Sequence, residues 1–124
     1  MPKSTHQLRP LFWVRSAKRD FTAFPAGIED GFGFELFLVQ SGLHPLSAKR
    51  LKGLGGGVLE LVGDETGDTY RAVYTVRFRQ AVYVLHAFKK KSRHGIATPK
   101  NEIEMVRRRL RDAAEDYARQ FGED

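Results

Sequence analysis

The chain has 124 residues, with 21 Lys and Arg against 15 Asp and Glu, and a formal net charge of +6. This length fits one domain over residues 1–124, with a flexible tail expected at residues 1–8. A hydrophobic share of 41% is enough to bury a core, which argues against a disordered chain. The lack of cysteine excludes disulfides, thiolate metal sites and cysteine nucleophiles. The excess of base favours an acidic partner: nucleic acid, an acidic protein or an anionic surface.

No segment of the sequence has the pattern of a membrane anchor. Residues Met1–Pro10 are polar and lack the apolar run of a secretory signal. No apolar run approaches the ~20 residues needed to cross a bilayer. We therefore expect a cytoplasmic protein without a membrane partner.

The first half of the chain predicts one strand and two helices. Leu11–Val14 is apolar and β-prone, which is typical of a strand. Ser16 is a candidate N-cap for a short helix that ends before Pro25. A second helix should end at Ser41–Gly42, and residues 44–57 should form a loop. The apolar face of that second helix has spacings of four, four and three: Ile28, Phe32, Leu36 and Val39.

The pattern then changes to that of strands. Val58–Val62 predicts a short strand, and a polar turn should follow at residues 63–68. Tyr70–Arg77 and Ala81–Phe88 predict a hairpin with Arg79 and Gln80 at its tip.

A C-terminal helix completes the predicted fold. Thr98 is the expected cap and Pro99 the first helical residue. Its expected buried stripe is Ile103, Val106, Leu110, Ala113 or Ala114, and Tyr117. The order β-α-α-β-β-β-α predicts an α+β fold, with helices on one face of a small, mostly antiparallel sheet.

Positive charge is concentrated between Asp68 and Glu102, where no acidic residue occurs. The basic residues of this segment are Arg71, Arg77, Arg79, Lys89, Lys90, Lys91, Arg93 and Lys100. One end of the sheet and the following loop should therefore form a positive surface. A solvated basic loop without a function is the alternative explanation.

Arg71 is the residue that the strand pattern singles out. Alternation places Arg71, Val73, Thr75 and Arg77 on one face of the strand. An Arg within an apolar strand is costly unless it meets a solvent cleft or an anion. Its planar, permanently charged guanidinium suits a phosphate.

Other patterns favour structural explanations. The run Arg107–Arg111 has acids at helical spacing, so a solvated helix face is favoured over a nucleic-acid reader. The glycines after Lys52 lack the ending of a P-loop and favour a flexible turn. His86 lies in a predicted strand and should be structural, whereas His44 and His94 lie in loops and can titrate near neutrality. No His pair has helical zinc-site spacing, so we expect no metal.

Several segments stand in a recognisable order and spacing. They are Arg9–Val14, Leu51–Gly53, Val58–Leu61, Tyr70–Val76, Leu85–Ser92 and Thr98–Lys100, the last followed by an Ile-bearing helix. Over roughly residues 9–117 the chain resembles the RelE/HigB toxin superfamily, and more narrowly its phage-derived, HigB-like branch.

The resemblance implies the toxin of a type II toxin–antitoxin system, with a fold like that of small microbial ribonucleases. It implies cleavage of mRNA on the ribosome, inhibition of translation, no cofactor, and a helix-turn-helix, HigA-like antitoxin as partner. The catalytic Arg of the family maps onto Arg71, and the basic cluster after the last strand maps onto Lys90 and Lys91. RelE carries lysines where this chain has Glu60, and its C-terminal Tyr has no equivalent near residues 96–98.

The chemistry predicts a metal-independent reaction in which the 2′-OH of the RNA attacks and leaves a 2′,3′-cyclic phosphate. This reaction needs a base, an acid and a cation beside the phosphorane. Arg71 would be the cation, and the base and acid would come from Lys52, Lys90, Lys91 or His94. The remaining cations expected to contact RNA or the ribosome are Lys49, Arg50, Arg77, Lys89, Arg93 and Lys100.

Two other functions stay open. One is a non-enzymatic toxin like the ParE relatives, which bind DNA gyrase. The other is a non-toxic, phage-derived RNA-binding module. Overexpression distinguishes the three functions. Cuts in mRNA would indicate the endonuclease, DNA damage with intact mRNA would indicate gyrase binding, and harmless overexpression would indicate the RNA-binding module.

Overall fold

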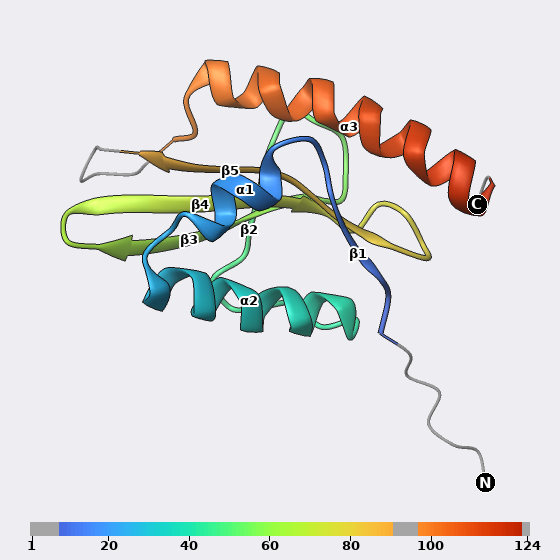
Figure 1. The fold of residues 1–124 in the computed structure, drawn as a ribbon. Coiled ribbons are helices and arrows are strands. Elements are labelled where there is room, and N and C mark those ends of the chain that lie inside the picture. Colours follow the sequence, from blue (N-terminus) through green and yellow to red (C-terminus); the bar gives the residue numbers. More distant parts are fainter. Residues whose placement is uncertain (1–7, 91–96, 123–124) are drawn as a thin grey trace, which may run out of the picture.

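The computed structural model describes residues 8–90 and 97–122, so the predicted tail lies outside the described residues except for Leu8. One sheet has the strand order β1-β5-β4-β3-β2 (Figure 1). Its strands are β1 (Leu11–Trp13), β2 (Lys49–Arg50), β3 (Val58–Glu65), β4 (Asp68–Thr75) and β5 (Val82–Lys90). β1 runs parallel to β5 and the other neighbours are antiparallel, so the sheet is mixed and the predicted α+β class is confirmed.

The strand bounds differ from the prediction by one or two residues at several strand ends, so that β4 ends at Thr75 before the predicted Arg77, and they differ more at two places. The segment predicted as a loop contains β2, whose two residues are too few to show a periodicity. β3 and β4 continue through most of the predicted polar turn, and only Thr66 and Gly67 lie between them. Arg79 and Gln80 lie in the predicted turn before β5.

The helices cover both faces of the sheet, and the prediction that they cover one face is wrong. They are α1 (Ala17–Thr22), α2 (Ala26–Gln40) and α3 (Lys100–Phe121). Figure 1 shows α2 below the sheet and α3 above it. Nearly every residue of β4 and β5 is buried, so both faces of these strands need a covering layer.

The lower layer confirms the predicted face of α2. Ile28, Phe32, Leu36 and Val39 are all buried there, against a sheet face that includes Leu59, Leu61 and Ala72. Gly63 of β3 allows the close approach of this helix, because a Cβ on Gly63 would lie 3.0 Å from the Cδ1 of Ile28. The missing side chain therefore sets the distance between helix and sheet.

The upper layer is formed by α3. Val106, Leu110, Ala113 and Tyr117 are buried as predicted, and Val73, Tyr83 and Leu85 of the sheet belong to the same core cluster. The N-cap is Pro99 and not the predicted Thr98, whose hydroxyl binds side chains of the sheet instead.

An irregularity in the β4–β5 pairing places two successive β5 residues toward α3. Val73 pairs with His86 and Tyr74 pairs with Val84, so Leu85 has no Cα partner in the register. This is the pattern of a β-bulge, which re-aims side chains beside functional sites. Leu85 joins the core under α3, and His86 lies next to it.

Within the described residues, no helix has both the length and the apolar character required to cross a bilayer.

Candidate active site

The side chain of Arg71 is buried and pairs with an internal carboxylate. It is 2% exposed, and its Nη1 donates a 2.7 Å hydrogen bond to Oε2 of Glu60, which is 4% exposed. Nη1 also lies 3.1 Å from the hydroxyl oxygen of Thr98, and that hydroxyl donates to Oε1 of Glu60 over 2.8 Å. The anion that an Arg in this strand requires is therefore Glu60, and Arg71 does not line an open cleft.

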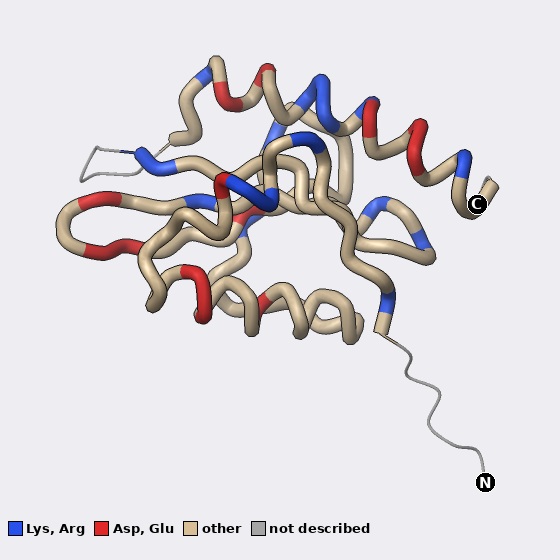
Figure 2. The backbone as a smooth tube through the Cα atoms, viewed as in Figure 1, with Lys and Arg blue, Asp and Glu red and all other residues tan. Residues whose placement is uncertain are grey.

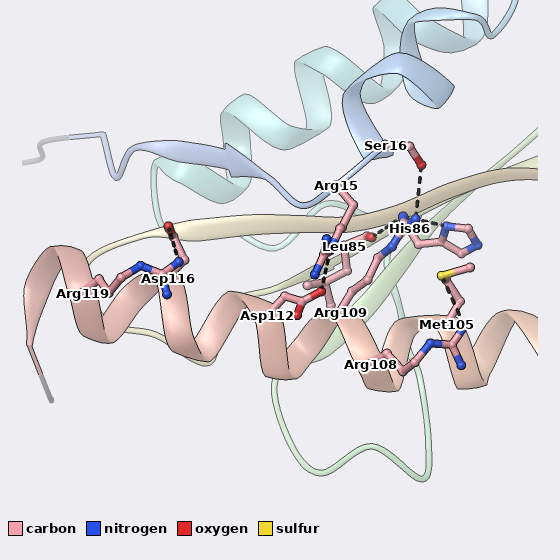
Figure 3. Close-up of polar contacts among 10 residues, drawn as sticks. All are labelled: Arg15, Ser16, Leu85, His86, Met105, Arg108, Arg109, Asp112, Asp116 and Arg119. Atoms are coloured by element: carbon pink, nitrogen blue, oxygen red, sulfur yellow. Dashed lines mark hydrogen bonds and ion pairs between the residues drawn. The ribbon is translucent and has the colours of Figure 1, made fainter.

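His86 forms a second polar group on the same face of the sheet. Its Nε2 lies 2.6 Å from Oε1 of Glu102, in the first turn of α3. Nη1 of Arg109 donates to the carbonyl oxygen of Leu85 over 3.1 Å and to Nδ1 of His86 over 3.3 Å (Figure 3). Because a guanidinium only donates, Nδ1 is the acceptor and Nε2 carries the proton toward Glu102.

Arg109 corrects the prediction that the whole arginine run is a solvated helix face. Its side chain points from α3 toward the sheet, and its Nη2 donates to the hydroxyl oxygen of Ser16 over 3.1 Å (Figure 3). The Ser16 hydroxyl donates in turn to Asp20 over 2.8 Å, so Ser16 is the N-cap of α1 by position but does not cap it with its side chain. Burial lowers the pKa of Arg109 from its usual value.

Together these groups form a polar layer between the sheet and α3, which we define as Glu60, Arg71, His86, Thr98, Glu102 and Arg109. The carboxylate, the guanidinium and the imidazole come from three adjacent strands, β3, β4 and β5. Lys49 of β2 is the direct cross-strand partner of Glu60, so its side chain projects from the same face. Thr98 and Glu102 close the layer from the α3 side.

Two of the predicted cations lie near Thr98. Nζ of Lys90 donates a 2.8 Å hydrogen bond to the carbonyl oxygen of Ala97, the residue before Thr98. Lys100 is exposed at the start of α3. Lys89 is also exposed, and its Nζ lies 3.4 Å from Oδ2 of Asp68. The structure thus brings Arg71, Lys90 and Lys100 to one end of α3.

The other predicted cations are placed differently. Arg50 and Lys52 are exposed at and after β2. Arg77 donates to the carbonyl oxygens of Leu54 (2.6 Å) and Gly56 (2.9 Å), so it holds the glycine loop. The remaining predicted site residues, Lys91, Arg93 and His94, lie outside the described residues.

Sequence reasoning missed Glu60 as a member of the site and assigned His86 a structural role only. A signal for Glu60 was present, because a lone acid interrupts the apolar run Val58–Val62. Glu102 and Thr98 gave no such signal, since acids and hydroxyls are common at helix starts. Within the residues that the structure describes, no group of three or more His, Asp or Glu side chains could hold a metal ion.

Charge is segregated over the molecule. Figure 2 shows acidic residues on α2 and at the β3–β4 turn, and basic residues at the end of β5 and along α3. α3 also carries acids: Arg15 donates a 3.0 Å hydrogen bond to Asp112, which lowers the pKa of that carboxyl.

Comparisons with known proteins identify similar chains. Residues 19–111 match the family described as phage derived protein Gp49-like. A solved structure of the toxin–antitoxin complex RelBE2 from Mycobacterium tuberculosis contains a chain with 18% identity and a TM-score of 0.48. The similarity covers 73% of the present chain and 100% of that chain, and at this level it carries no functional conclusion. No curated protein matches the sequence.

Proposed function

Since the chain belongs to the phage-derived Gp49-like family, a family of RelE/HigB-type toxins, we propose that it is a toxin that cuts translated mRNA in the cytoplasm. Its partners in this proposal are mRNA on the ribosome and the helix-turn-helix antitoxin of a type II system. The observation that carries the proposal is the presence of Glu60, Arg71 and His86 on one face of three adjacent strands.

These three side chains supply the groups that cleavage by the 2′-OH of RNA requires. Glu60 is the base that accepts the 2′-OH proton, and the oxygen then attacks the neighbouring phosphorus. The guanidinium of Arg71 stabilises the charge of the phosphorane. For the acid step His86 is an imidazolium, with a proton on Nδ1 in place of the hydrogen bond that Arg109 donates there in the free protein. Its Nε2 proton, which points at an oxygen of Glu102, passes to the leaving 5′-oxygen and leaves a neutral imidazole. The products are a 2′,3′-cyclic phosphate and a 5′-OH.

The substrate phosphate must replace bonds that the polar layer now makes internally. Arg71 Nη1 is held by Glu60 and Thr98, and His86 Nε2 is held by Glu102. Glu102 lies in the first turn of α3, and Thr98 lies two residues before the helix begins. A small shift of this end of α3 therefore frees the Arg71 and His86 side chains together. Phosphate oxygens then take the place of the Thr98 hydroxyl and the Glu102 carboxylate.

The exposed cations around this end of α3 would hold the RNA backbone. Lys90 and Lys100 lie beside Thr98, and Lys49 projects from the face that carries Glu60. Lys52 and Arg50 extend the positive charge along β2 and the following loop. Lys52, Lys90, Lys91 and His94 also remain candidates for the acid or base.

The proposal is tested by expressing the chain and variants with neutral, polar replacements in bacteria. Wild-type protein should arrest growth and produce cuts in translated mRNA, detected by mapping RNA 5′ ends. Glu60→Gln and His86→Gln should each reduce cleavage about 10²–10⁴-fold, the usual contribution of an acid–base group. Glu104→Gln, at an exposed acid of α3, is the matched control and should cleave like wild type.

Thermal unfolding of the purified variants shows whether they are folded. Wild-type-like cleavage by folded Glu60→Gln and His86→Gln variants would remove these residues from the mechanism. DNA damage with intact mRNA would instead favour gyrase binding, and harmless overexpression would favour an RNA-binding module.

A further inference from the structure

Arg109 is a buried cation that the proposed reaction does not use. It is 8% exposed, and burial lowers the pKa of its guanidinium. Within the described residues its hydrogen bonds go to neutral acceptors, which are the Leu85 carbonyl oxygen, the Ser16 hydroxyl and Nδ1 of His86 (Figure 3). A buried charge is costly when no opposite charge is in direct contact with it. The stability of the fold therefore does not explain why α3 carries a cation at this position.

Arg109 and Glu102 contact the same imidazole from one face of α3. Seven positions separate them, which is close to two helical turns of about 3.6 residues each, so both side chains lie on one face of the helix. Glu102 lies 2.6 Å from Nε2 of His86, and Arg109 donates to Nδ1 over 3.3 Å. Phe88 stacks on the imidazole, with 5.1 Å between the ring centroids. α3 therefore holds both nitrogens of a ring whose plane is fixed by Phe88.

The two contacts have opposite effects on the protonation of the imidazole. A carboxylate at Nε2 favours the charged ring, whereas a guanidinium at Nδ1 occupies the second nitrogen with a donor and repels a positive charge. Arg71 and Glu60, the other charges of the polar layer, pair with each other. Asp20 of α1 accepts a hydrogen bond from Ser16, which itself accepts one from Arg109. The guanidinium of Arg109 is thus the group that keeps a second proton off the ring.

We propose that Arg109 is a positioning residue that holds His86 neutral in the free protein and releases Nδ1 when RNA binds. The shift of α3 that separates Glu102 from His86 also withdraws Arg109, because both belong to one helix. A hydronium ion of the solvent then supplies a proton to Nδ1, and the Nε2 proton passes to the leaving 5′-oxygen. The acid therefore forms only in the complex with RNA. This inference rests on the proposed function, because it describes how the acid of that reaction is made.

Ser16 fixes the position of Arg109 from the side of α1. The Ser16 hydroxyl accepts from Nη2 of Arg109 over 3.1 Å and donates to Asp20 over 2.8 Å. Ser16→Ala removes this anchor and leaves the charge of Arg109 in place. Arg109→Met removes the charge and keeps an unbranched side chain. The two variants therefore separate the position of the guanidinium from its presence.

The first experiment observes the ring nitrogens of His86 by heteronuclear NMR of the isotopically labelled chain without RNA, near neutral pH. Wild type should show a bare Nδ1 and a protonated Nε2. Arg109→Met should show protons on both nitrogens, because the carboxylate of Glu102 is then unopposed. Ser16→Ala should lie between the two. Arg108→Met removes the same charge at the adjacent, exposed position of α3 and should match wild type.

The second experiment follows cleavage of mRNA on purified ribosomes over a range of pH. The wild-type rate should fall as the pH rises, because Nδ1 must gain a proton before the acid step. Arg109→Met should move this fall to higher pH, so that its rate relative to wild type grows by up to about tenfold per pH unit between the two falls. Arg108→Met should leave the fall in place. A merely structural role of Arg109 would lower the rate by the same factor at every pH.

A proton on Nδ1 in free wild type, or a bare Nδ1 in folded Arg109→Met, would overturn the proposal, as would a pH profile that Arg109→Met leaves in place. Thermal unfolding shows whether Arg109→Met is folded. If it is not, identical ring-nitrogen resonances in wild type and Ser16→Ala would overturn the proposal instead. Intact mRNA with wild type would contradict the proposed function, and the NMR spectra would still decide whether Arg109 holds His86 neutral.

Discussion

Arg71 and Glu60 are charged side chains that the fold buries almost completely. Removing each of these two charges from water costs several kcal/mol. The 2.7 Å ion pair between them and the hydrogen bond from the Thr98 hydroxyl to Glu60 offset that cost only while both charged partners are present. An apolar pair of similar size would give at least comparable stability. Stability alone therefore does not explain the ion pair, which agrees with the catalytic roles proposed for both residues.

Breaking this pair and replacing it should have opposite consequences for stability. Arg71→Met leaves the Glu60 charge buried without its partner and should reduce the free energy of unfolding by about 3–5 kcal/mol. Arg71→Met combined with Glu60→Leu should recover most of that loss but should not cleave RNA. Urea unfolding measures the stabilities, and a double variant less stable than Arg71→Met would contradict this explanation.

Tyr83 and Asp116 form a second interaction with a measurable pH dependence. The Tyr83 hydroxyl donates a 2.6 Å hydrogen bond to Asp116, which lowers the pKa of that carboxyl. A lowered pKa gives stability that is present above the unfolded carboxyl pKa of roughly 3.9 and is lost as the pH falls through the folded value.

Tyr83→Phe should therefore destabilise the protein by about 1 kcal/mol at pH 7, and the difference from wild type should shrink below pH 4. Urea unfolding at pH 7 and at pH 3 measures both differences. A difference that stays constant between the two pH values would show that lost packing, and not the charged hydrogen bond, explains the effect.

The orientation of Arg71 could be predicted from residue types, but its partner could not. Strand alternation separates Arg71 and Val73 from Tyr70 and Ala72, and the two core clusters confirm that separation. Glu60 lies eleven positions away, and its approach depends on the β3–β4 register, which the sequence pattern does not specify. The His86 environment depends on the β-bulge and on Arg109, both of which are tertiary features.

Elements with a strong pattern were predicted well, and short or doubly buried ones were not. α2 and α3 have periodic apolar faces, so the sequence pattern predicts both the helices and their buried side chains. β2 has two residues and no period. β4 and β5 are buried on both faces, and sequence alternation alone does not show that a helix must cover each side.

The glycine loop before β3 has a constrained backbone at Gly57. Gly57 has φ +78°, and a Cβ there would lie 3.2 Å from the backbone nitrogen of Arg77. Its carbonyl oxygen accepts hydrogen bonds from the Val76 amide and the Thr75 hydroxyl. The loop therefore links the start of β3 to the end of β4.

Gly57→Ala should lower the free energy of unfolding by about 1–3 kcal/mol, since it combines a left-handed conformation with a close contact. Gly56→Ala is the matched control, because its Cβ would meet nothing within 4 Å and its φ lies outside the left-handed range. Thermal unfolding compares the two, and equal midpoints would contradict the proposed constraint.

At the scale of the whole molecule, the charges behind the net charge of +6 are distributed unevenly over two surfaces. The basic end of β5 and α3 adjoins the polar layer, whereas α2 and the β3–β4 turn are acidic (Figure 2). The sheet lies between the two surfaces, so the proposed RNA contacts fall on the α3 side only. Binding of RNA should weaken steeply with salt, as for any contact made mainly with phosphates.

The chemistry of the RNA ends tests the central proposal most directly. Fragments of translated mRNA from cells expressing the chain are isolated, and their termini are identified by selective ligation and mass spectrometry. Attack by the 2′-OH predicts 2′,3′-cyclic phosphate and 5′-OH termini, absent from cells that express folded His86→Gln. Fragments with 5′-phosphate and 3′-OH termini, or mRNA that stays intact during growth arrest, would contradict it.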